Sequence, residues 1–444
     1  MQAPFDIAAD LNTPVSAYLR LSSLQPRYLL ETVEGGAQGR YSFIGFGRVD
    51  RATLTTEDEP LGSLRVALNG AAECGPQIVG QPFYGGLVGV TAFDLVRRLY
   101  RLPDTPHPAD VPLGIYMSTE SILVFDHLTR RIALLHSGDP SDRQTLRGEV
   151  IGALRGPIQD GHHSESHQVP TASMSRGEYM TGVDHAKKHI RAGDVYQLVL
   201  SIRFGGMTDL DPFAVYRALR LLNPSPYMYF IDFEDLQVVG SSPEALVKLM
   251  GSTAELRPIA GTRPRGADEF ADLVMERQLL ADTKEAAEHV MLVDLARNDL
   301  GRTAVAGSVR VDPYRIIERY SHVMHLVSGV TGHLRPGLDP FDLFAATFPA
   351  GTVTGAPKLR AIELIDELEP VNRNLYSGSV GYFGHGGSMD QAITIRTMVF
   401  HDGGYSYQAG AGIVADSDPE REHDEVLSKG AALQAALELA REGL

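Results

Sequence analysis

The sequence has very little cysteine, since Cys74 is the single thiol in 444 residues. One cysteine cannot form an intramolecular disulfide or a thiolate metal cluster, and it leaves no cysteine pair for redox chemistry. Glu73 and Gly75 flank Cys74 and no histidine lies nearby in the sequence, so a structural role is favoured over a nucleophile. This usage fits a reducing compartment.

Tryptophan is absent, and basic residues are in the minority: 40 Lys and Arg stand against 56 Asp and Glu, a formal net charge of −16. An acidic chain repels nucleic acid and anionic membranes unless a basic patch overrides the global field. The nearest candidate, Arg97, Arg98 and Arg101, alternates with apolar residues and predicts the solvent-facing side of an amphipathic helix.

No uninterrupted apolar span is long enough to cross a bilayer, and residues 1–10 do not have the pattern of a secretory signal. We therefore expect a cytoplasmic protein that binds neither nucleic acid nor membrane.

The hydrophobic periodicity changes along the chain. Short β-type runs separated by turns fill the region up to residue 154: 42–45, 85–90, 114–118, 122–125 and 132–136. Further on, helical patterns over 178–192 and 212–222 alternate with strand patterns over 195–204, 227–233 and 237–241. Residues 268–296 suit one or two helices, and Asp418 with Pro419 marks the start of a final helix. The class is α/β or α+β.

The segment 156–176 is polar, lacks periodicity, and contains proline, glycine and several serines. Such composition is typical of an exposed connection. We therefore divide the chain into an N-terminal region 1–155, a linker 156–176 and a C-terminal domain 177–444.

Two acidic pairs lie on predicted helices. Glu285 and Glu288 are three residues apart, as are Glu422 and Glu425, so each pair occupies one helix face. Taken singly, each pair is a solvated helix face more often than a site. If the pairs converge, a hard cation would be needed between the carboxylates, and oxygen ligands favour Mg²⁺ over zinc. Lys429 would share the face of Glu425.

Two glycine-rich segments, 349–358 (PAGTVTGAPK) and 408–413 (QAGAGI), read as turns that precede helices. Backbone amides at such turns bind carboxylate or phosphate, although a tight connection without ligand is equally plausible. The glycine spacing in 349–358 does not match a nucleotide-binding loop. Arg396, in a β-type run over 392–399, is suited to clamp a carboxylate or to form a structural ion pair.

Two further residues are candidates for proton transfer. Glu244 follows a predicted strand end, where partial burial would raise its pKa enough for acid catalysis. His325 could transfer a proton near neutral pH, although histidines at strand ends are more often structural.

These motifs form one series that resembles the chorismate-utilising enzymes, which comprise the anthranilate, aminodeoxychorismate, isochorismate and salicylate synthases. The C-terminal part supplies GDVYQLVLS, NPSPYMYF, SSPEALVKL, RPIAGTRPRG, EHVMLVDLARNDLGR, SHVMHLVSGV, FPAGTVTGAPK, YSGSVGYF, ITIRT, QAGAGIVADSDPE and EHDEVLSKG. The N-terminal part adds LLETVEGGAQGRYSFIG and PFYGGLVG. The resemblance covers most of the chain and implies an α+β fold, a sandwich of two β-sheet subdomains surrounded by helices.

The resemblance also implies roles for individual residues. Glu288 and Glu425 match the principal Mg²⁺ ligands, with Glu285 and Glu422 supporting them. Glu244 matches the acid that protonates the departing ring hydroxyl, and His325 the histidine of the pyruvate-elimination step. The family's contacts to the two substrate carboxylates fall on Thr354, Gly355, Tyr376, Arg396, Gly410, Ala411, Gly412 and Lys429.

Two positions separate the members of the family. Gln197 stands where the isochorismate and salicylate synthases carry a water-activating lysine, and glutamine cannot act as a general base. Ala260, in the motif that also contains Thr262, stands where aminodeoxychorismate synthases carry a nucleophilic lysine. Alanine cannot attack carbon 2 of the ring, so the resemblance implies direct attack by ammonia, as in anthranilate synthases.

The resemblance further implies a glutamine amidotransferase subunit as ammonia source, hence a hetero-oligomer, and feedback inhibition by tryptophan. The inhibitor would bind between Leu30, Glu31 and Thr32 on one side and Asn223, Pro224, Ser225, Pro226, Tyr227 and Met228 on the other. Thr32 replaces the usual serine, and its extra methyl group would weaken inhibition.

Two alternatives remain open from the sequence. The same fold could act as an aminodeoxychorismate synthase, against which Ala260 argues. The chain could also be a catalytically silent protein that binds tryptophan or chorismate, against which the carboxylates and Arg396 argue.

Overall fold

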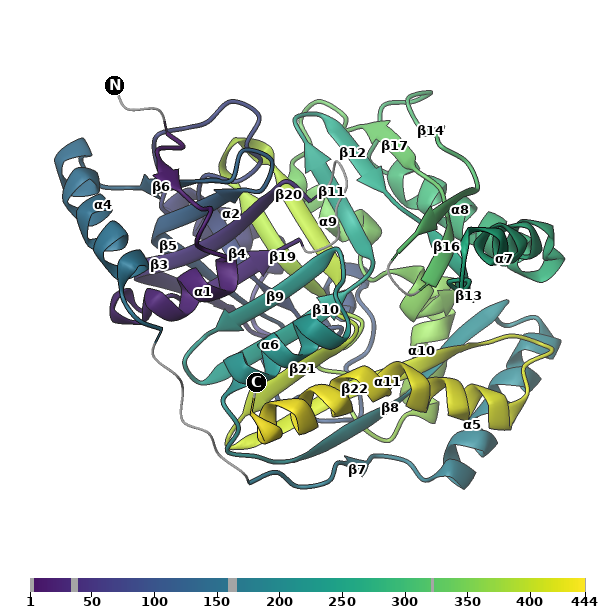
Figure 1. Cartoon of the computed structure of the whole chain (residues 1–444). Coiled ribbons are helices and arrows are strands. Elements are labelled where there is room, and N and C mark those ends of the chain that lie inside the picture. Colours follow the sequence, from purple (N-terminus) through teal and green to yellow (C-terminus); the bar gives the residue numbers. More distant parts are fainter. Residues whose placement is uncertain (1–3, 33–38, 159–165, 321–322, 444) are drawn as a thin grey trace.

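The computed structural model describes residues 4–32, 39–158, 166–320 and 323–443 (Figure 1). The predicted α+β class is confirmed, because helices surround a large, mostly antiparallel sheet. The helices are α1 (Pro14–Arg20), α2 (Pro60–Gly70), α3 (Leu95–Tyr100), α4 (Pro140–Arg155), α5 (Arg176–Ala192), α6 (Pro212–Leu222), α7 (Glu269–Ala281), α8 (Thr283–Gly301), α9 (Pro340–Thr347), α10 (Lys358–Leu368) and α11 (Pro419–Glu442).

The strands of the described residues belong to two sheets. The large sheet joins β1 (Ile7–Ala8), β2 (Tyr28–Glu31), β3 (Tyr41–Leu54), β4 (Gly86–Thr91), β5 (Gly114–Asp126), β6 (Arg131–His136), β7 (Thr171–Ala172), β8 (Gln197–Met207), β9 (Tyr227–Asp232), β10 (Leu236–Ser242), β11 (Ala245–Met250), β12 (Thr253–Leu256), β14 (Arg310–Val311), β17 (Val330–His333), β18 (Gly355–Ala356), β19 (Ser379–Gly384), β20 (Met389–Ile393), β21 (Thr397–His401) and β22 (Gly404–Ile413). The small sheet contains β13 (Ile259–Pro264), β15 (Ile316–Arg319) and β16 (Val323–Val327).

The large sheet is continuous between the two predicted regions of the chain. Strand β4 of the N-terminal region pairs with β19, and β2 pairs with β9. The side chains of these strands are buried on both faces, in two apolar clusters. The described residues on either side of the predicted linker thus share backbone hydrogen bonds. The division into 1–155, 156–176 and 177–444 stays a prediction.

Local capping explains where several helices begin. Ser175 and Glu178 form a capping box at the start of α5, and the Asp418 side chain accepts hydrogen bonds from backbone N–H groups at the start of α11, as predicted. The range 268–296 contains two helices, because Asp282 ends α7 and caps α8. Figure 1 shows α11, in yellow, beside β22, α5 and α6.

Two expectations for the N-terminal region were wrong. The runs 114–118 and 122–125 belong to one strand, β5, which pairs with β3 over its whole length. Arg97 does not face solvent: it is 5% exposed and donates to Asp94 and Asp366. The periodicity could not reveal these partners, because Asp366 lies on α10. None of the helices in the described part of the chain is long and apolar enough to cross a membrane.

Candidate active site

Glu244 lies in the short connection between β10 and β11, where its carbonyl accepts a hydrogen bond from the Ile393 N–H at 3.0 Å. Glu244 lines a small cavity of about 40 Å³ together with Thr352, Asp299 and several apolar residues. Burial raises the pKa of Glu244 to about 7, and the neighbouring positive charges of Lys429 and Arg396 oppose this rise. The predicted acid therefore holds a proton up to neutral pH.

His325 lies on β16, directly opposite Thr262 of β13. Its Nδ1 is 2.9 Å from the Gly261 carbonyl and 3.2 Å from the Thr262 hydroxyl. Since a carbonyl can only accept, Nδ1–H donates a hydrogen bond to it, which leaves Nε2 as the acceptor nitrogen of a neutral ring. Burial lowers the pKa of His325, with a further contribution from Arg396. Thr262 and His325, both predicted catalytic positions, are in contact.

Arg396 does not lie within a strand, contrary to the prediction. Strand β20 ends at Ile393 and β21 begins at Thr397, so Arg396 occupies the bend between them. Its φ is 48°, in the left-handed region that few non-glycine residues adopt. The guanidinium acts electrostatically on both Glu244 and His325. It therefore lies in the same region as the two proton-transfer candidates.

Lys429 of α11 connects this region to the acidic residues. Its ammonium group donates to the Gly410 carbonyl at 3.0 Å and lies 2.8 Å from the carboxylate of Glu425. It also lowers the pKa of Glu244. The cation predicted to bind substrate thus touches one glycine-rich segment and one acidic pair.

The segment 349–358 is a turn, as predicted. A 3-10 turn over Gly351–Val353 leads through the buried Thr354 into β18 and then α10. Gly355 has φ 138° and pairs with Leu198 of β8, and an added Cβ would meet the Gln197 carbonyl oxygen at 2.2 Å. Only glycine fits this approach, so the backbone of the turn packs directly against the backbone of β8.

The segment 408–413 is not a turn, contrary to the prediction. It forms the end of β22 and pairs with β8 through Ile413. Its glycines make room for neighbouring side chains. A Cβ at Gly410 would lie 2.7 Å from the Tyr376 hydroxyl, and one at Gly412 would lie 2.6 Å from Nε2 of Gln197. The segment is rich in glycine because the side chains of Tyr376 and Gln197 lie close against β22, and not because the backbone forms a turn.

The remaining predicted substrate and specificity positions are buried near these segments. Gln197, Ala260, Tyr376 and Ala411 are each less than 10% exposed. Burial raises the pKa of Tyr376 to about 12, so its hydroxyl stays protonated and can donate.

The two acidic pairs lie on α8 and α11, and Glu425 of α11 acts electrostatically on Glu288 of α8. Burial raises the pKa of Glu288, and the charges of Glu285 and Glu425 add to this rise. Burial also raises the pKa of Glu422, with a contribution from Glu425. Within residues 4–32, 39–158, 166–320 and 323–443, no three His, Cys, Asp or Glu side chains are close enough together to hold a metal. Glu425 instead pairs with Lys429.

The predicted inhibitor segments border a second cavity, of about 310 Å³, inside the large sheet. Leu30, Glu31 and Thr32 line it from one side, and Tyr227 and Met228 line it from the other. Its described lining does not include the turn 223–226, which leads from α6 into β9.

Both carboxylate oxygens of Glu31 point toward α6. They accept hydrogen bonds from the Tyr216 hydroxyl at 2.7 Å and from Arg220 at 2.8 Å. Glu31 therefore fixes β2 to α6 with its side chain.

Sequence reasoning missed the polar groups of this cavity, Lys248 and Asp390. They form an ion pair at 3.4 Å, and Asp390 also accepts from the Tyr227 hydroxyl at 3.0 Å. Strands β11 and β20 bring the two residues together although 142 positions separate them in the chain (390 − 248). The alternation along β20 signals that Asp390 and Ala392 share a face, but the partner strand is not evident from the sequence.

Comparison with known proteins gives concordant matches. A family model described as chorismate binding enzyme matches residues 25–435. The chain is 45% identical over 452 residues to anthranilate synthase component 1 of Thermus thermophilus, covering 98% of this chain and 97% of the relative. It is 44% identical over 478 residues to the protein of the same name from Pseudomonas aeruginosa, covering 99% and 96%.

A solved structure gives a similar result. Anthranilate synthase component I from Streptococcus pneumoniae has a TM-score of 0.80 with this chain at 33% identity, covering 98% of this chain and all of the other.

Proposed function

This chain belongs to the family of chorismate binding enzymes, and we propose that it acts as component I of anthranilate synthase, which converts chorismate and ammonia to anthranilate and pyruvate. The relatives named for this activity match nearly the whole chain in both directions.

The arrangement of two cations carries the proposal. Arg396 acts on both Glu244 and His325, while Lys429 acts on Glu244 and contacts Glu425. A substrate with two carboxylates, such as chorismate, would find two positive groups in the surroundings of the acid. Cations placed beside a buried acid favour bound anions and position the reacting ring.

The residues present support ammonia as the nucleophile. Gln197 is buried and cannot activate water as a base. Ala260 is buried on β13 and carries no nucleophilic group. Gln197 offers no base to activate water, and Ala260 offers no nucleophilic side chain. We therefore assign ammonia as the nucleophile that attacks carbon 2 of the ring.

The acidic pairs on α8 and α11 fit Mg²⁺ by their donor chemistry. Four carboxylates supply only oxygen ligands, which a hard cation prefers. Burial raises the pKa of Glu288, and the negative charges of Glu285 and Glu425 raise it further; a divalent cation would offset this repulsion. We propose Glu288 and Glu425 as the principal ligands, supported by Glu285 and Glu422. The bound ion would neutralise the ring carboxylate of the substrate.

The proton transfers are assigned to two side chains. Glu244, whose pKa burial raises to about 7, is partly protonated near neutral pH and would pass its proton to the ring hydroxyl as that group departs. His325, with Nδ1 held by the Gly261 carbonyl, presents Nε2 as a proton acceptor for the elimination of pyruvate. Arg396 orients the substrate between them.

Ammonia requires a source outside this chain. The single thiol, Cys74, is buried, and burial raises its pKa to about 12, which is unsuited to a glutaminase nucleophile. We propose that a glutamine amidotransferase, component II, supplies ammonia in a hetero-oligomer. A cytoplasmic location likewise stays a prediction.

We also propose that tryptophan occupies the cavity that residues of β2 and β9 line. Its volume of about 310 Å³ lies in the range of small-molecule sites. Leu30 and Met228 offer apolar contacts, while Lys248 and Asp390 offer charges that complement the carboxylate and ammonium of an amino acid. Filling this cavity would inhibit the enzyme.

The decisive experiment incubates the purified chain with chorismate, Mg²⁺ and ammonium salt and follows anthranilate fluorescence. We expect turnover that requires Mg²⁺ and that Glu288→Gln abolishes. Glu420→Gln, on an exposed part of α11, is the matched control and should retain activity. Formation of the para-amino product, or full activity of Glu288→Gln, would contradict the proposal.

The inhibitor proposal has its own test. Tryptophan should inhibit the wild-type chain, and Lys248→Met should lose this inhibition while keeping turnover without tryptophan. Lys188→Met, on the exposed side of α5, serves as control. Wild-type turnover that saturating tryptophan leaves unchanged would refute this assignment.

A further inference from the structure

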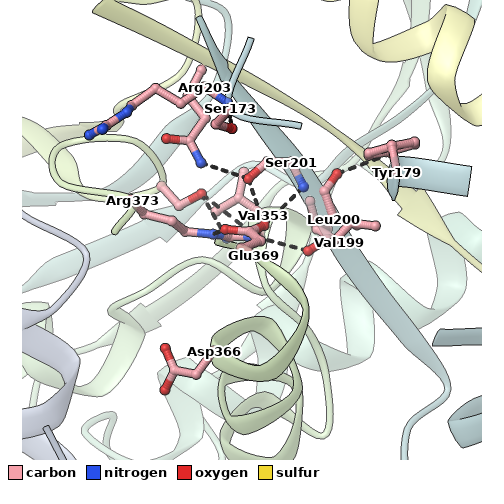
Figure 2. Close-up of polar contacts among 12 residues, drawn as sticks. Ser173, Tyr179, Val199, Leu200, Ser201, Arg203, Val353, Asp366, Glu369 and Arg373 are labelled. Atoms are coloured by element: carbon pink, nitrogen blue, oxygen red, sulfur yellow. Dashed lines mark hydrogen bonds and ion pairs between the residues drawn. The ribbon is translucent and has the colours of Figure 1, made fainter. Parts of the chain in front are cut away.

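A buried polar cluster lies between β8, β22 and the C-terminal end of α10 (Figure 2). At its centre Arg373 and Glu369 form a bidentate ion pair, with nitrogen–oxygen distances of 2.6 and 2.9 Å. Both residues are 3% exposed. None of the chemistry assigned above uses either residue.

Arg373 joins the substrate-binding turn to the neighbouring strand. Its guanidinium donates to the Val353 carbonyl at 2.8 Å and to the Val199 carbonyl at 2.9 Å. Val353 immediately precedes Thr354, and the Val199 N–H donates to the Thr354 carbonyl at 2.9 Å. One planar group therefore fixes both sides of the contact between the turn and β8, as Figure 2 shows.

Glu369 extends the cluster to the glycine-containing end of β22. Its carboxylate accepts from the Ser201 N–H at 2.9 Å and the Ser201 hydroxyl at 2.7 Å. The same hydroxyl accepts from Gln408 of β22 at 2.8 Å. Ser201 lies opposite Gly410, one of the predicted substrate contacts, in the β8–β22 ladder.

The cluster also supports a predicted substrate-binding side chain. The Arg373 guanidinium lies over the Tyr376 ring at 5.4 Å from its centroid. Tyr376 follows Arg373 by three residues, so a shift of the guanidinium would move the ring and its hydroxyl. Three segments with predicted substrate contacts thus meet at one ion pair: the turn before β18, the end of β22 and the loop after α10.

A buried ion pair is a poor means of adding stability, because desolvation offsets most of the attraction. It does impose geometry, since each donor and acceptor demands its partner at a fixed distance and angle. We propose that Arg373 and Glu369 are positioning residues that hold these three segments in the arrangement that binds the substrate carboxylates. This inference rests on the proposed function.

The test compares Arg373→Lys with Arg97→Lys. Arg97 is 5% exposed and makes a comparable set of bonds, to Asp94, Asp366 and the Pro103 carbonyl, but none of these partners belongs to a substrate-binding segment. Lysine keeps the charge and loses the planar fork. Both variants should melt at a lower temperature than wild type.

Only Arg373→Lys should raise the KM for chorismate, by about tenfold or more, while the KM for ammonium stays unchanged. A purely structural role would lower the melting temperature alone. A chorismate KM of Arg373→Lys within about twofold of wild type, measured well below its melting temperature, would overturn the proposal.

If Arg373→Lys does not fold, Ser201→Ala decides. This variant removes the hydroxyl that joins Glu369 to Gln408 and leaves the ion pair in place. A rise of about threefold or more in the chorismate KM supports the proposal, and an unchanged value overturns it. Absence of anthranilate formation by the wild-type chain would instead be a failure of the proposed function.

Discussion

Replacing Glu244 with glutamine should make the protein more stable at alkaline pH and nearly inactive. Burial raises the pKa of this carboxyl from its ordinary value of 4.5 to about 7. A raised pKa means that the folded protein resists ionisation of Glu244, whereas the unfolded chain does not. Stability linked to this group is therefore complete below pH 4.5 and is lost as the pH rises through 7.

The size of the loss follows from the two pKa values. One tenfold change in ionisation corresponds to ~1.4 kcal/mol, so holding the ionised carboxylate costs the folded protein at most about 3 kcal/mol. Glutamine has nearly the same shape and no charge, so the variant avoids this cost. Removing a general acid lowers kcat by about 10²- to 10⁴-fold. The wild-type kcat should fall as the pH rises through about 7, because the acid loses its proton.

Urea unfolding of both proteins at about pH 5 and about pH 8 measures the stability term. The wild type should lose up to about 3 kcal/mol more than Glu244→Gln between these values. Glu367→Gln, on the exposed side of α10, is the control and should behave as wild type. Equal pH dependence in wild type and Glu244→Gln, or a variant kcat within about tenfold of wild type, would refute the reasoning.

Three other substitutions test neighbouring parts of the structure. Gly412→Ala places a methyl group 2.6 Å from Nε2 of Gln197 and should raise the chorismate KM about tenfold in steady-state assays; an unchanged KM would contradict this contact. Lys429→Met should weaken chorismate binding and tighten Mg²⁺ binding, because it removes a cation from beside Glu425; a Mg²⁺ titration in which affinity falls would argue against the assignment. Arg220→Met leaves the Glu31 carboxylate buried without its cation and should cost about 3 kcal/mol in urea unfolding, while a loss below about 1 kcal/mol would show that Tyr216 suffices.

The sequence predicted those features whose causes are local. The α6 helix occupies 212–222 as expected, and α11 begins at Pro419, directly after the Asp418 cap. Both depend on caps and periodicity within a few residues. Glu244 was expected at a strand end with partial burial and lies there, because the proline before it interrupts the strand.

Features set by distant partners could not be predicted. The segment 408–413 contains two glycines, Gly410 and Gly412, that favour a turn, yet the ladder to β8 makes it a strand. Arg396 was expected in a strand, but it lies in the bend between β20, which pairs with β11, and β21, which pairs with β10, and its φ is left-handed. In both cases tertiary pairing outweighs local preference.

The electrostatic partners of the site were equally hidden. The sequence around Arg97 does not indicate that Asp366 is its partner, and the sequence around Lys248 does not indicate Asp390. The spacing of Glu369 and Arg373, four residues apart, is a recognisable signal for an ion pair. Its burial and its bonds to two strands depend on the folded sheet.

The place of Tyr227 in the sheet has a consequence for control of catalysis. This cavity residue lies directly opposite Ser242, two positions before Glu244, and Ala392 of the same cavity lies opposite Ala245, just after Glu244. A small molecule bound in this cavity would contact strands whose backbone continues on either side of Glu244, the proposed proton donor. If the proposed inhibitor binds there, we expect it to slow catalysis from within the sheet without contacting the substrate.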